Sequence, residues 1–229
     1  MVDLALLKQV GLFRRVDADD LSRLGDLLVH RRYKAGQVIF HQGDPDTSFH
    51  IIASGRASIS LISEDGQELV VASFGEGDFF GELALLDSQP RSATATAVTA
   101  VDTHTLRRDE FLAFLSATPS AAIAICVTLA ERLRRTDERL ADGTFLSMPQ
   151  RLAKWILQMS ELSGRESDEG LVVDIPYNQR ELGEMIGASR QSVNKVLSQW
   201  EDSGFLRRDG RNLVLKRPEQ LLNIFRPGI

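Results

Sequence analysis

The sequence contains little that could build a disulfide-bonded or metal-held protein. Only one of its 229 residues is cysteine, Cys126, so no internal disulfide can form and clustered thiol ligands for zinc or iron–sulfur centres are missing. The four histidines are scattered, and no HExxH-type pair joins them. We therefore expect no metal site, and we expect Cys126 to pack as a small hydrophobic residue of a helix.

Long apolar runs and catalytic motifs are also missing. No stretch of 18 or more apolar residues occurs, and no basic start precedes the apolar N-terminal stretch, so neither a membrane span nor a secretory signal is indicated. We expect a cytoplasmic protein without membrane contact. The GxSxG and GxxxxGKS/T motifs are absent, and residues 150–229 show no acid–base or nucleophile constellation. The sequence thus predicts no catalytic residues and no enzyme.

Residues 36–110 are typical of an antiparallel β region. Short runs such as FHIIASG, RASISLIS and ELVVASF alternate with turn-like segments such as GDPD and FGEGD. The Asp65-Gly66 step predicts a tight hairpin turn, because glycine tolerates the positive φ that such turns need. Five or more short strands imply a sandwich or barrel. Before this region, residues 17–29 have helical spacing, with Asp17 as the expected N-cap and Leu21, Leu24, Leu27 and Leu28 on one face.

Pro119 opens a long helical pattern that runs to residue 145. A narrow stripe at 4-3-4-3-4 spacing is formed by Ala122, Cys126, Leu129, Leu133, Thr136 and Leu140. Such a stripe is typical of the a and d positions of a coiled coil, which favours pairing with a second copy of the helix in a homodimer. Packing of the stripe onto the β domain is the alternative. Within a seam, the Thr136 hydroxyl would need a hydrogen-bond partner, which a ligand could supply.

After a boundary near residues 141–149, the chain has the layout of a helix-turn-helix. Two helical patterns meet at Gly187-Ala188-Ser189, and Ser189 can cap the second helix. Val193, Val196, Leu197 and Trp200 share the apolar face of that helix. Its other face offers side chains that suit base edges in the major groove. These candidate DNA-binding residues are Arg190, Gln191, Asn194 and Lys195, with Ser189 at the cap.

A hairpin predicted at Asp209-Gly210 follows, with Arg207, Arg208 and Arg211 expected to contact phosphates. Residues 176–217 contain eight Lys or Arg against five Asp or Glu, whereas the whole chain has a net charge of −5. The basic residues are therefore concentrated on the proposed DNA-binding segment. A solvated amphipathic helix pair is the alternative reading of this segment.

The stretch FGELALLDSQPRSATATA places Glu82 and Arg91 nine positions apart. Two interpretations stay open from the residues alone. The first is a salt bridge across a bend between strands, which contributes little. The second is a pocket for a ligand that carries both an anion and hydroxyl groups.

Over essentially its whole length, the chain resembles the CRP/FNR family of bacterial transcription regulators. GELALLDSQPRSA is similar to the phosphate-binding cassette of cyclic-nucleotide-binding domains, and RELGEMIGASRQSVNKVL is similar to the family's winged helix-turn-helix. The resemblance implies that Glu82 accepts from the ribose 2′-hydroxyl, that Arg91 pairs with the cyclic phosphate, and that Ser92 and the amides after Gly81 complete the cradle. The implied cassette residues are Gly81, Glu82, Leu83, Ala84, Arg91 and Ser92.

The resemblance also implies roles on the long helix. Thr136 matches a threonine that reaches the adenine amino group, and Arg132 matches an arginine that communicates with the cassette glutamate. Asp137 replaces a serine with which the partner subunit reaches the base, so cyclic GMP and cyclic di-GMP stay open beside cyclic AMP. In the recognition helix, Gln191 and Lys195 replace a glutamate and an arginine, so we expect a related but altered operator.

The expected fold class is α+β: an N-terminal cyclic-nucleotide-binding β-roll (jelly roll), a long dimerisation helix and a C-terminal winged helix-turn-helix. We place these domains at residues 1–118, 119–143 and 149–229. The expected function is a homodimeric regulator that binds a cyclic nucleotide and a palindromic double-stranded DNA operator, with RNA polymerase as a partner and no further cofactor. A ligand-independent regulator of the same family and a regulatory subunit acting through protein contacts are the alternatives.

Overall fold

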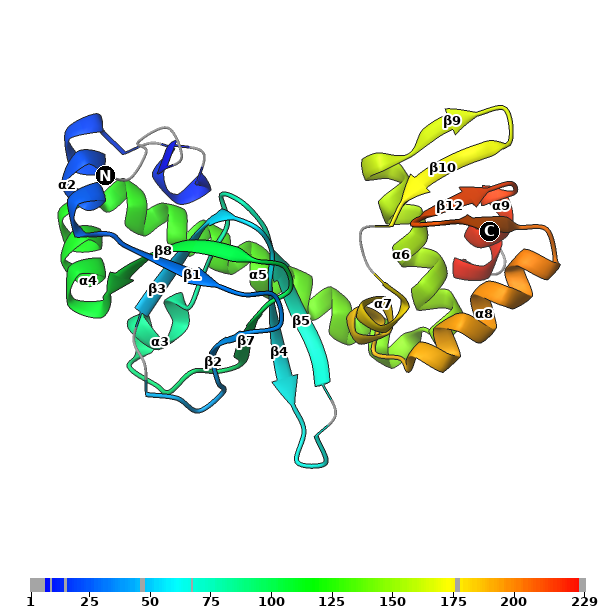
Figure 1. Cartoon of the computed structure of the whole chain (residues 1–229), viewed down its shortest axis with the longest axis horizontal. Helices are drawn as coiled ribbons and strands as arrows, with labels where there is room; N and C mark the ends of the chain where they lie inside the picture. Colours follow the sequence, from blue (N-terminus) through cyan, green and yellow to red (C-terminus); the bar gives the residue numbers. More distant parts are fainter. Residues whose placement is uncertain are drawn as a thin grey trace. The chain divides into compact units, whose positions relative to one another are not determined.

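The computed structural model describes residues 7–8, 10–14, 16–45, 48–66, 68–175 and 178–226. The chain forms two compact units, Met1–Arg135 and Thr136–Ile229, and each is considered by itself. Most elements of both units are labelled in Figure 1.

The first unit is built on two four-stranded antiparallel sheets (Figure 1). One sheet has the order β1-β8-β3-β6, and the other has the order β2-β7-β4-β5. The strands of the first sheet are β1 (Val29–Tyr33), β8 (Val101–Arg107), β3 (Ser48–Ser54) and β6 (Phe79–Phe80). Those of the second are β2 (Val38–Phe40), β7 (Thr94–Ala97), β4 (Ala57–Ile62) and β5 (Glu68–Phe74). Of the sandwich or barrel expected from the short β-rich runs, the two sheets form a sandwich.

Four successive residues of strand β3 are buried. Because side chains alternate along a strand, both of its faces are therefore buried. Phe49 and Ile51 pack into a cluster with the helices of the unit, whereas Ile52 packs between the sheets with Phe40 and Phe80. The buried run FHII therefore contributes to two cores, and its second residue is a histidine.

Helices cover one side of this sandwich. They are η1 (Gly11–Phe13), α2 (Ala18–Leu27), α3 (Glu82–Asp87), α4 (Arg108–Ala117) and the first part of α5 (Pro119–Phe145). Asp17 holds the N-cap position of α2 as predicted, but its side chain makes no capping hydrogen bond. Leu21 and Leu24 are buried, whereas Leu27 is 42% exposed, so only part of the predicted leucine face enters the core.

The long helix α5 begins at Pro119, as predicted, and presents two different faces. Ala121 and Ile125 are buried against the β-sandwich unit, and Leu129 is partly buried in the same cluster. Leu133 and Leu140 are exposed by 62% and 70%. Cys126 is exposed too, so the expectation of a packed cysteine is wrong for the single chain. One residue beyond Ile125 on a helix points about 100° away from the core.

The second unit joins a helical cluster to a small sheet of order β11-β12-β10-β9. Its elements are α6 (Met148–Ser163), β9 (Arg165–Ser167), β10 (Gly170–Asp174), α7 (Gln179–Ile186), α8 (Arg190–Asp202), β11 (Leu206–Asp209), β12 (Asn212–Leu215) and α9 (Pro218–Phe225). Leu152, Trp155 and Ile156 of α6 share one core with the apolar faces of α7 and α8. The two predicted helices and the following β-hairpin are confirmed.

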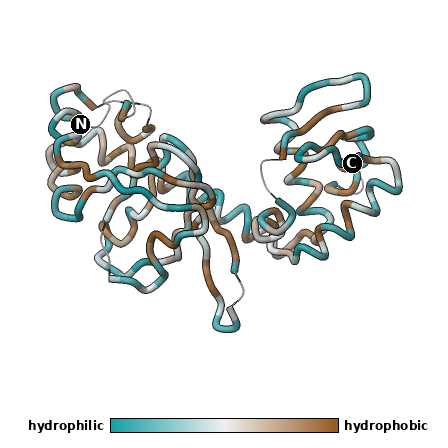
Figure 2. The backbone as a smooth tube through the Cα atoms, in the orientation of Figure 1, coloured by the Kyte–Doolittle hydropathy of each residue, from teal (hydrophilic) through white to brown (hydrophobic). Residues whose placement is uncertain are grey.

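The turns predicted from glycine are confirmed as well. Gly66, Gly187 and Gly210 have φ values of +77°, +66° and +60°, which favour glycine. Gly66 joins β4 to β5, and the tip of this hairpin is hydrophilic while its strands are largely hydrophobic (Figure 2). In the part of the chain that the structure describes, no single helix has the length and apolar character needed to cross a membrane. The pair α4 and α5 meets that test only together, and the two helices are bent by 111°.

Candidate functional site

The residues from Gly81 to Arg91 form a compact cassette after the short strand β6. Arg91 is 3% exposed, and its Nη1 donates a hydrogen bond to the Gly81 carbonyl at 2.8 Å. Its Nη2 donates to the Ser48 carbonyl at 2.6 Å, and the guanidinium carbon lies 4.0 Å from the centre of the Phe40 ring. The guanidinium is therefore held in a fixed place by backbone oxygens and an aromatic face.

Gly81 is required by this arrangement. Its φ is +86°, and a Cβ atom there would lie 2.8 Å from Nη1 of Arg91 and 2.9 Å from the Ser48 carbonyl oxygen. Any larger residue would displace the guanidinium that the cassette is built around. The carbonyl of Gly81 therefore approaches Arg91 closely only because this position has no side chain.

Glu82 is also buried, with 3% of its surface exposed, but its partner comes from a distant helix. Its Oε1 accepts from Nη1 of Arg132, on α5, at 2.8 Å. Nη2 of Arg132 donates to the Phe79 carbonyl at 2.6 Å, and the guanidinium lies over the rings of Phe74 and Phe79 at 4.5 and 4.7 Å. The first residue of α3 is thus bonded to α5 across fifty positions of sequence.

The two charges of the cassette therefore have separate partners. Among the described residues, the ion pair of Glu82 is with Arg132, so the bridge between Glu82 and Arg91 that the sequence left open is not formed. Both side chains are almost fully buried, and buried charges need close partners. Of the other cassette residues, Ala84 is buried, Leu83 is 44% exposed and Ser92 is exposed.

The C-terminal end of α3 is fixed by a residue that the sequence did not indicate. Arg108, at the start of α4, donates from Nε to the Leu85 carbonyl at 3.0 Å and from Nη2 to Ser88 Oγ at 2.6 Å. Ser88 has a φ of +61°, which is unusual for a residue other than glycine. Twenty or more positions separate Arg108 from these partners, so no local motif could have revealed the contact.

Thr136 and Asp137 are exposed residues of α5 in the second unit. Their expected contact with a ligand base therefore stays a prediction. In the same unit, Ser189 caps α8 as predicted, since its Oγ accepts from the Ser192 amide at 3.1 Å. Gly183 packs against the turn between α7 and α8, where an added Cβ would lie 2.5 Å from the Ala188 carbonyl oxygen.

Helix α8 is amphipathic in the expected register. The buried residues of α8 are Val193, Val196, Leu197 and Trp200. On the opposite face Arg190, Gln191 and Lys195 are exposed and Asn194 is half-buried. The structure therefore brings together all four side chains that the sequence proposed for base contacts, on one helix whose N-terminus is capped.

The arginines of the following hairpin have partners that the sequence did not predict. Arg207 donates to Glu169 at 2.6 Å, and Arg208 donates to both Glu201 carboxylate oxygens, from its backbone at 2.9 Å and from Nε at 2.8 Å. The backbone and side-chain hydrogen bonds from Arg208 hold the pKa of Glu201 below its usual value. Carboxylates thus partly compensate these two cations, whereas Arg211 is exposed. Contact of the three arginines with phosphates stays a prediction.

Comparison with known proteins bears on both units. Residues 30–118 match the model of the cyclic nucleotide-binding domain, and residues 150–224 match that of the Crp-like helix-turn-helix domain. Over 216 residues the chain is 32% identical to the "CRP-like cAMP-activated global transcriptional regulator" of Mycobacterium tuberculosis, covering 94% of this chain and 96% of that protein. The chain belongs to the CRP/FNR family of transcription regulators.

Solved structures show the same architecture for this CRP/FNR family regulator. The c-di-GMP responsive global regulator CLP of Xanthomonas campestris is 26% identical, with a TM-score of 0.76 over 87% of this chain and 99% of that one. A CooA mutant from Carboxydothermus hydrogenoformans is 20% identical with a TM-score of 0.78, over 89% of this chain and 90% of that one, which shows the fold. The expected β-roll, long helix and C-terminal helix-turn-helix are confirmed.

The chain is a DNA-binding transcription regulator with a cyclic nucleotide-binding domain, and its relatives are regulators rather than enzymes. The names of two similar proteins mention different small molecules: cAMP for the Mycobacterium tuberculosis regulator and c-di-GMP for CLP. These two names therefore do not identify one common small molecule.

Proposed function

We propose that this regulator is a cytoplasmic homodimer whose binding to a palindromic DNA operator is controlled by cyclic AMP or a related cyclic nucleotide. The observation that supports this most is the pair of buried charges at Glu82 and Arg91, held by different partners at the two ends of one short cassette. An anion between them would meet a guanidinium, and a hydroxyl would meet a carboxylate. A ribose cyclic phosphate carries both groups.

In this proposal Arg91 contributes most of the affinity, because charge-assisted hydrogen bonds shielded from water are strong. The guanidinium has five N–H donors in a planar fork, so it can keep its backbone carbonyls while binding a phosphate. Ser92 and the backbone amides after Gly81 would complete the cradle. Glu82 would accept from the 2′-hydroxyl.

Arg132 connects the site to α5. A ligand hydroxyl that donates to Glu82 would either replace Arg132 as a partner of the carboxylate or bind beside it. Ligand binding would therefore bias the position of α5 relative to the cassette, which is a population shift of a two-state element. Thr136 and Asp137 on the same helix would contact the base, with Asp137 able to accept from either adenine or guanine.

The exposed apolar residues of α5 support the homodimer. Ile123, Val127, Leu133 and Leu140 are 65%, 51%, 62% and 70% exposed in the single chain. An apolar stripe on a long helix is stabilised by pairing with a second copy, and a two-fold axis would relate the two α8 helices. Dimers of this kind read half-sites about one DNA turn apart.

The capped helix α8 would read those half-sites in the major groove. Arg190 can donate two hydrogen bonds to guanine, and Gln191 or Asn194 can pair with adenine. Lys195 and Arg211 would contact the major groove or phosphates. RNA polymerase would be the protein partner through which the bound dimer affects transcription.

The proposal is tested by selecting DNA fragments from a random library with the purified protein, with and without cyclic AMP, cyclic GMP or cyclic di-GMP. We expect enrichment of a palindromic site that depends on one of these nucleotides. Equal enrichment without any nucleotide would favour the ligand-independent alternative. Nucleotide binding without any DNA enrichment would favour a regulatory subunit that acts through protein contacts.

A further inference from the structure

His50 is a buried titratable residue that the proposed effector chemistry does not use. It lies on β3 and is 2% exposed. Its ring stacks on Phe80 with 4.9 Å between centroids and an interplanar angle of 7°. It also lies 5.8 Å from Phe40, whose ring supports the Arg91 guanidinium on its face. This is an apolar, aromatic surrounding in which a phenylalanine would serve the same packing.

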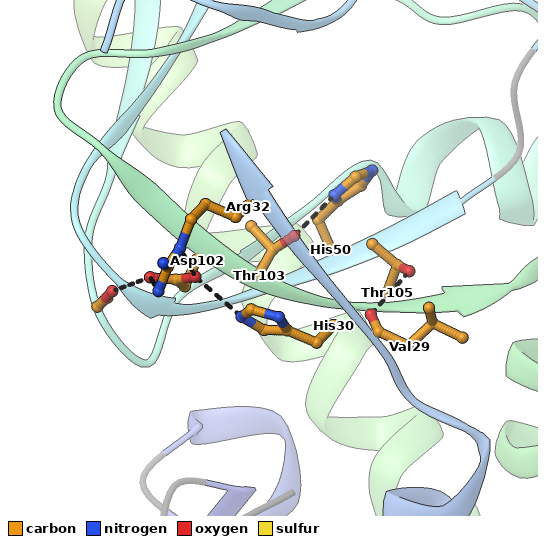
Figure 3. Close-up of polar contacts among 8 residues, drawn as sticks. Val29, His30, Arg32, His50, Asp102, Thr103 and Thr105 are labelled. Atoms are coloured by element: carbon orange, nitrogen blue, oxygen red, sulfur yellow. Dashed lines mark hydrogen bonds and ion pairs between the residues drawn. The ribbon is translucent and has the colours of Figure 1, made fainter. Parts of the chain in front are cut away.

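The polar atoms of His50 are bonded within the core. Its Nδ1 lies 3.5 Å from Thr103 Oγ1 on β8 (Figure 3). Its Nε2 lies 3.0 Å from Ser48 Oγ. The contact with Ser48 has the length of a good hydrogen bond, whereas the contact with Thr103 is long. Ser48 is therefore the stronger of these two partners.

Ser48 in turn bonds to the cassette arginine. Nη2 of Arg91 donates to the Ser48 carbonyl at 2.6 Å and lies 3.3 Å from Ser48 Oγ. Ser48 and His50 are two positions apart on β3, so their side chains lie on the same face of the strand. A continuous chain of contacts thus runs from His50 through Ser48 to Arg91.

A serine hydroxyl can rotate, so its direction is set by what it bonds to. We assign the tautomer in which Nε2 of His50 accepts from the Ser48 hydroxyl, so that Ser48 Oγ is left to accept from Nη2 of Arg91. The His50 ring is itself held by stacking on Phe80. A guanidinium whose donors are already oriented loses less freedom when a phosphate binds, which raises affinity.

We propose that His50 is a positioning residue for the effector site: it orients the Ser48 hydroxyl and thereby holds Arg91 in the geometry that receives a phosphate. This inference rests on the proposed binding of a cyclic nucleotide at Arg91. It differs from a purely structural role, in which His50 would contribute only to packing between the sheets.

The test uses the full-length protein and two substitutions that divide the roles of the ring. His50→Phe keeps the stack on Phe80 and removes the bond to Ser48, whereas His50→Gln can keep that bond and removes the ring. Titration calorimetry with cyclic AMP, cyclic GMP and cyclic di-GMP gives the dissociation constants, and thermal unfolding gives the stability. His104→Phe, on the neighbouring strand β8, is the matched control.

For the nucleotide that the wild type binds, we expect His50→Phe to raise the dissociation constant by about threefold to tenfold, which corresponds to one hydrogen bond. His50→Gln should bind more tightly than His50→Phe, and His104→Phe should bind as the wild type does. The double substitution Ser48→Ala with His50→Phe should bind no more weakly than Ser48→Ala alone, because the effect passes through one hydroxyl. Equal binding by His50→Phe and wild type, or additive losses, would overturn the proposal.

A readout without ligand separates this inference from the proposed function. The Arg91 side-chain NH resonances, assigned with Arg91→Lys, report how the guanidinium is held in the free protein. We expect them to shift and broaden in His50→Phe and not in His104→Phe. If the wild type binds none of the three nucleotides, the proposed effector is wrong. Unchanged Arg91 resonances in His50→Phe would then reject the positioning role by itself, and shifted ones would support it.

Discussion

At the scale of single residues, one missing side chain and two buried charges shape the cassette. Gly81 leaves room for the Arg91 guanidinium, and the Gly81 and Ser48 carbonyls fix that guanidinium in place. Arginine suits this position because its planar fork can bond to two carbonyls and still present donors to a phosphate. A point charge on a flexible stem could not do both.

Arg91→Lys should therefore lose nucleotide affinity with little change of fold. We expect about a tenfold to hundredfold rise in the dissociation constant, because hydrogen bonds that involve a charged group are worth about 1.5–3 kcal/mol. Titration calorimetry measures it, with circular dichroism to check the fold. Arg31→Ala, at an exposed arginine of β1, is the control. Undiminished affinity in Arg91→Lys would contradict the assigned role.

His104 gives a prediction of pH dependence. Burial first, and then the nearby charge of His30, hold its pKa below the usual value of about 6.5. The unfolded chain therefore binds a proton at His104 before the folded chain does, so acid favours unfolding. The stability contributed by this group is present above about pH 6.5 and is lost as pH falls through the lowered pKa. Chemical denaturation between pH 7 and 5 should show that the free energy of unfolding falls less steeply with pH in His104→Gln than in the wild type. An equal fall in both proteins would contradict this.

At the scale of elements, short helices and strands are held in place by arginines from distant segments. α3 has only six residues and could not be stable alone. Arg132 bonds to its first residue, and Arg108 bonds to the Leu85 carbonyl and Ser88 near its end. The helix is thus fixed at both ends by guanidinium groups from the helices α5 and α4.

Arg108→Ala should loosen the C-terminal end of α3. We expect a loss of about 1–2 kcal/mol of stability, because the substitution leaves the Leu85 carbonyl without a charged donor. Nucleotide affinity should also fall, because part of the binding free energy is then used to order the cassette. Denaturant unfolding and calorimetry measure the two effects. A loss of stability with unchanged affinity would show that Arg108 supports the fold and not the site.

Helix α8 carries a prediction on DNA. Arg190→Ala should relax the choice of base at one position of each half-site, at a cost of about 1–3 kcal/mol in discrimination. Selected-site sequencing measures it. Ser198→Ala, on the same face about two turns further from the N-terminus of α8, is the comparison within the same helix. A selected profile identical to that of the wild type would refute base reading by Arg190.

At the scale of the whole molecule, α5 belongs to both units. Its first turns pack on the β-sandwich through Ala121 and Ile125, and it continues to Phe145 in the second unit. The exposed leucines at 133 and 140 lie seven positions apart on this continuous helix. In the proposed dimer, ligand state and DNA reading can be coupled through this helix.

Leu133→Lys combined with Leu140→Lys should therefore separate the copies. We expect a monomer by analytical ultracentrifugation and a loss of operator affinity, because one α8 helix reads only a half-site. Ile62→Lys, at an exposed apolar residue of β4, is the matched control. A doubly substituted protein that stays dimeric would place the interface elsewhere.

Local chemistry determined most of the fold and the outline of the sites. Apolar alternation predicted the β region, glycine and proline predicted the turns and the start of α5, and the spacing of apolar residues predicted the buried face of α8. These features depend on neighbours within a few positions, so they can be read from the order of residues alone. The cassette stretch was recognisable because its glycine, glutamate and arginine are close in sequence.

Only the tertiary structure decided which partners the charges have. Glu82 pairs with Arg132, Arg91 with Ser48, Arg108 with the end of α3, and Arg208 with Glu201. It also decided that Cys126 faces outwards and that His50 lies between the sheets. The physical reason is that a buried polar group must find a partner wherever the folded chain provides one, and that place is set by the packing of distant elements. Sequence order fixes the periodicity of each element, but not what lies across from it.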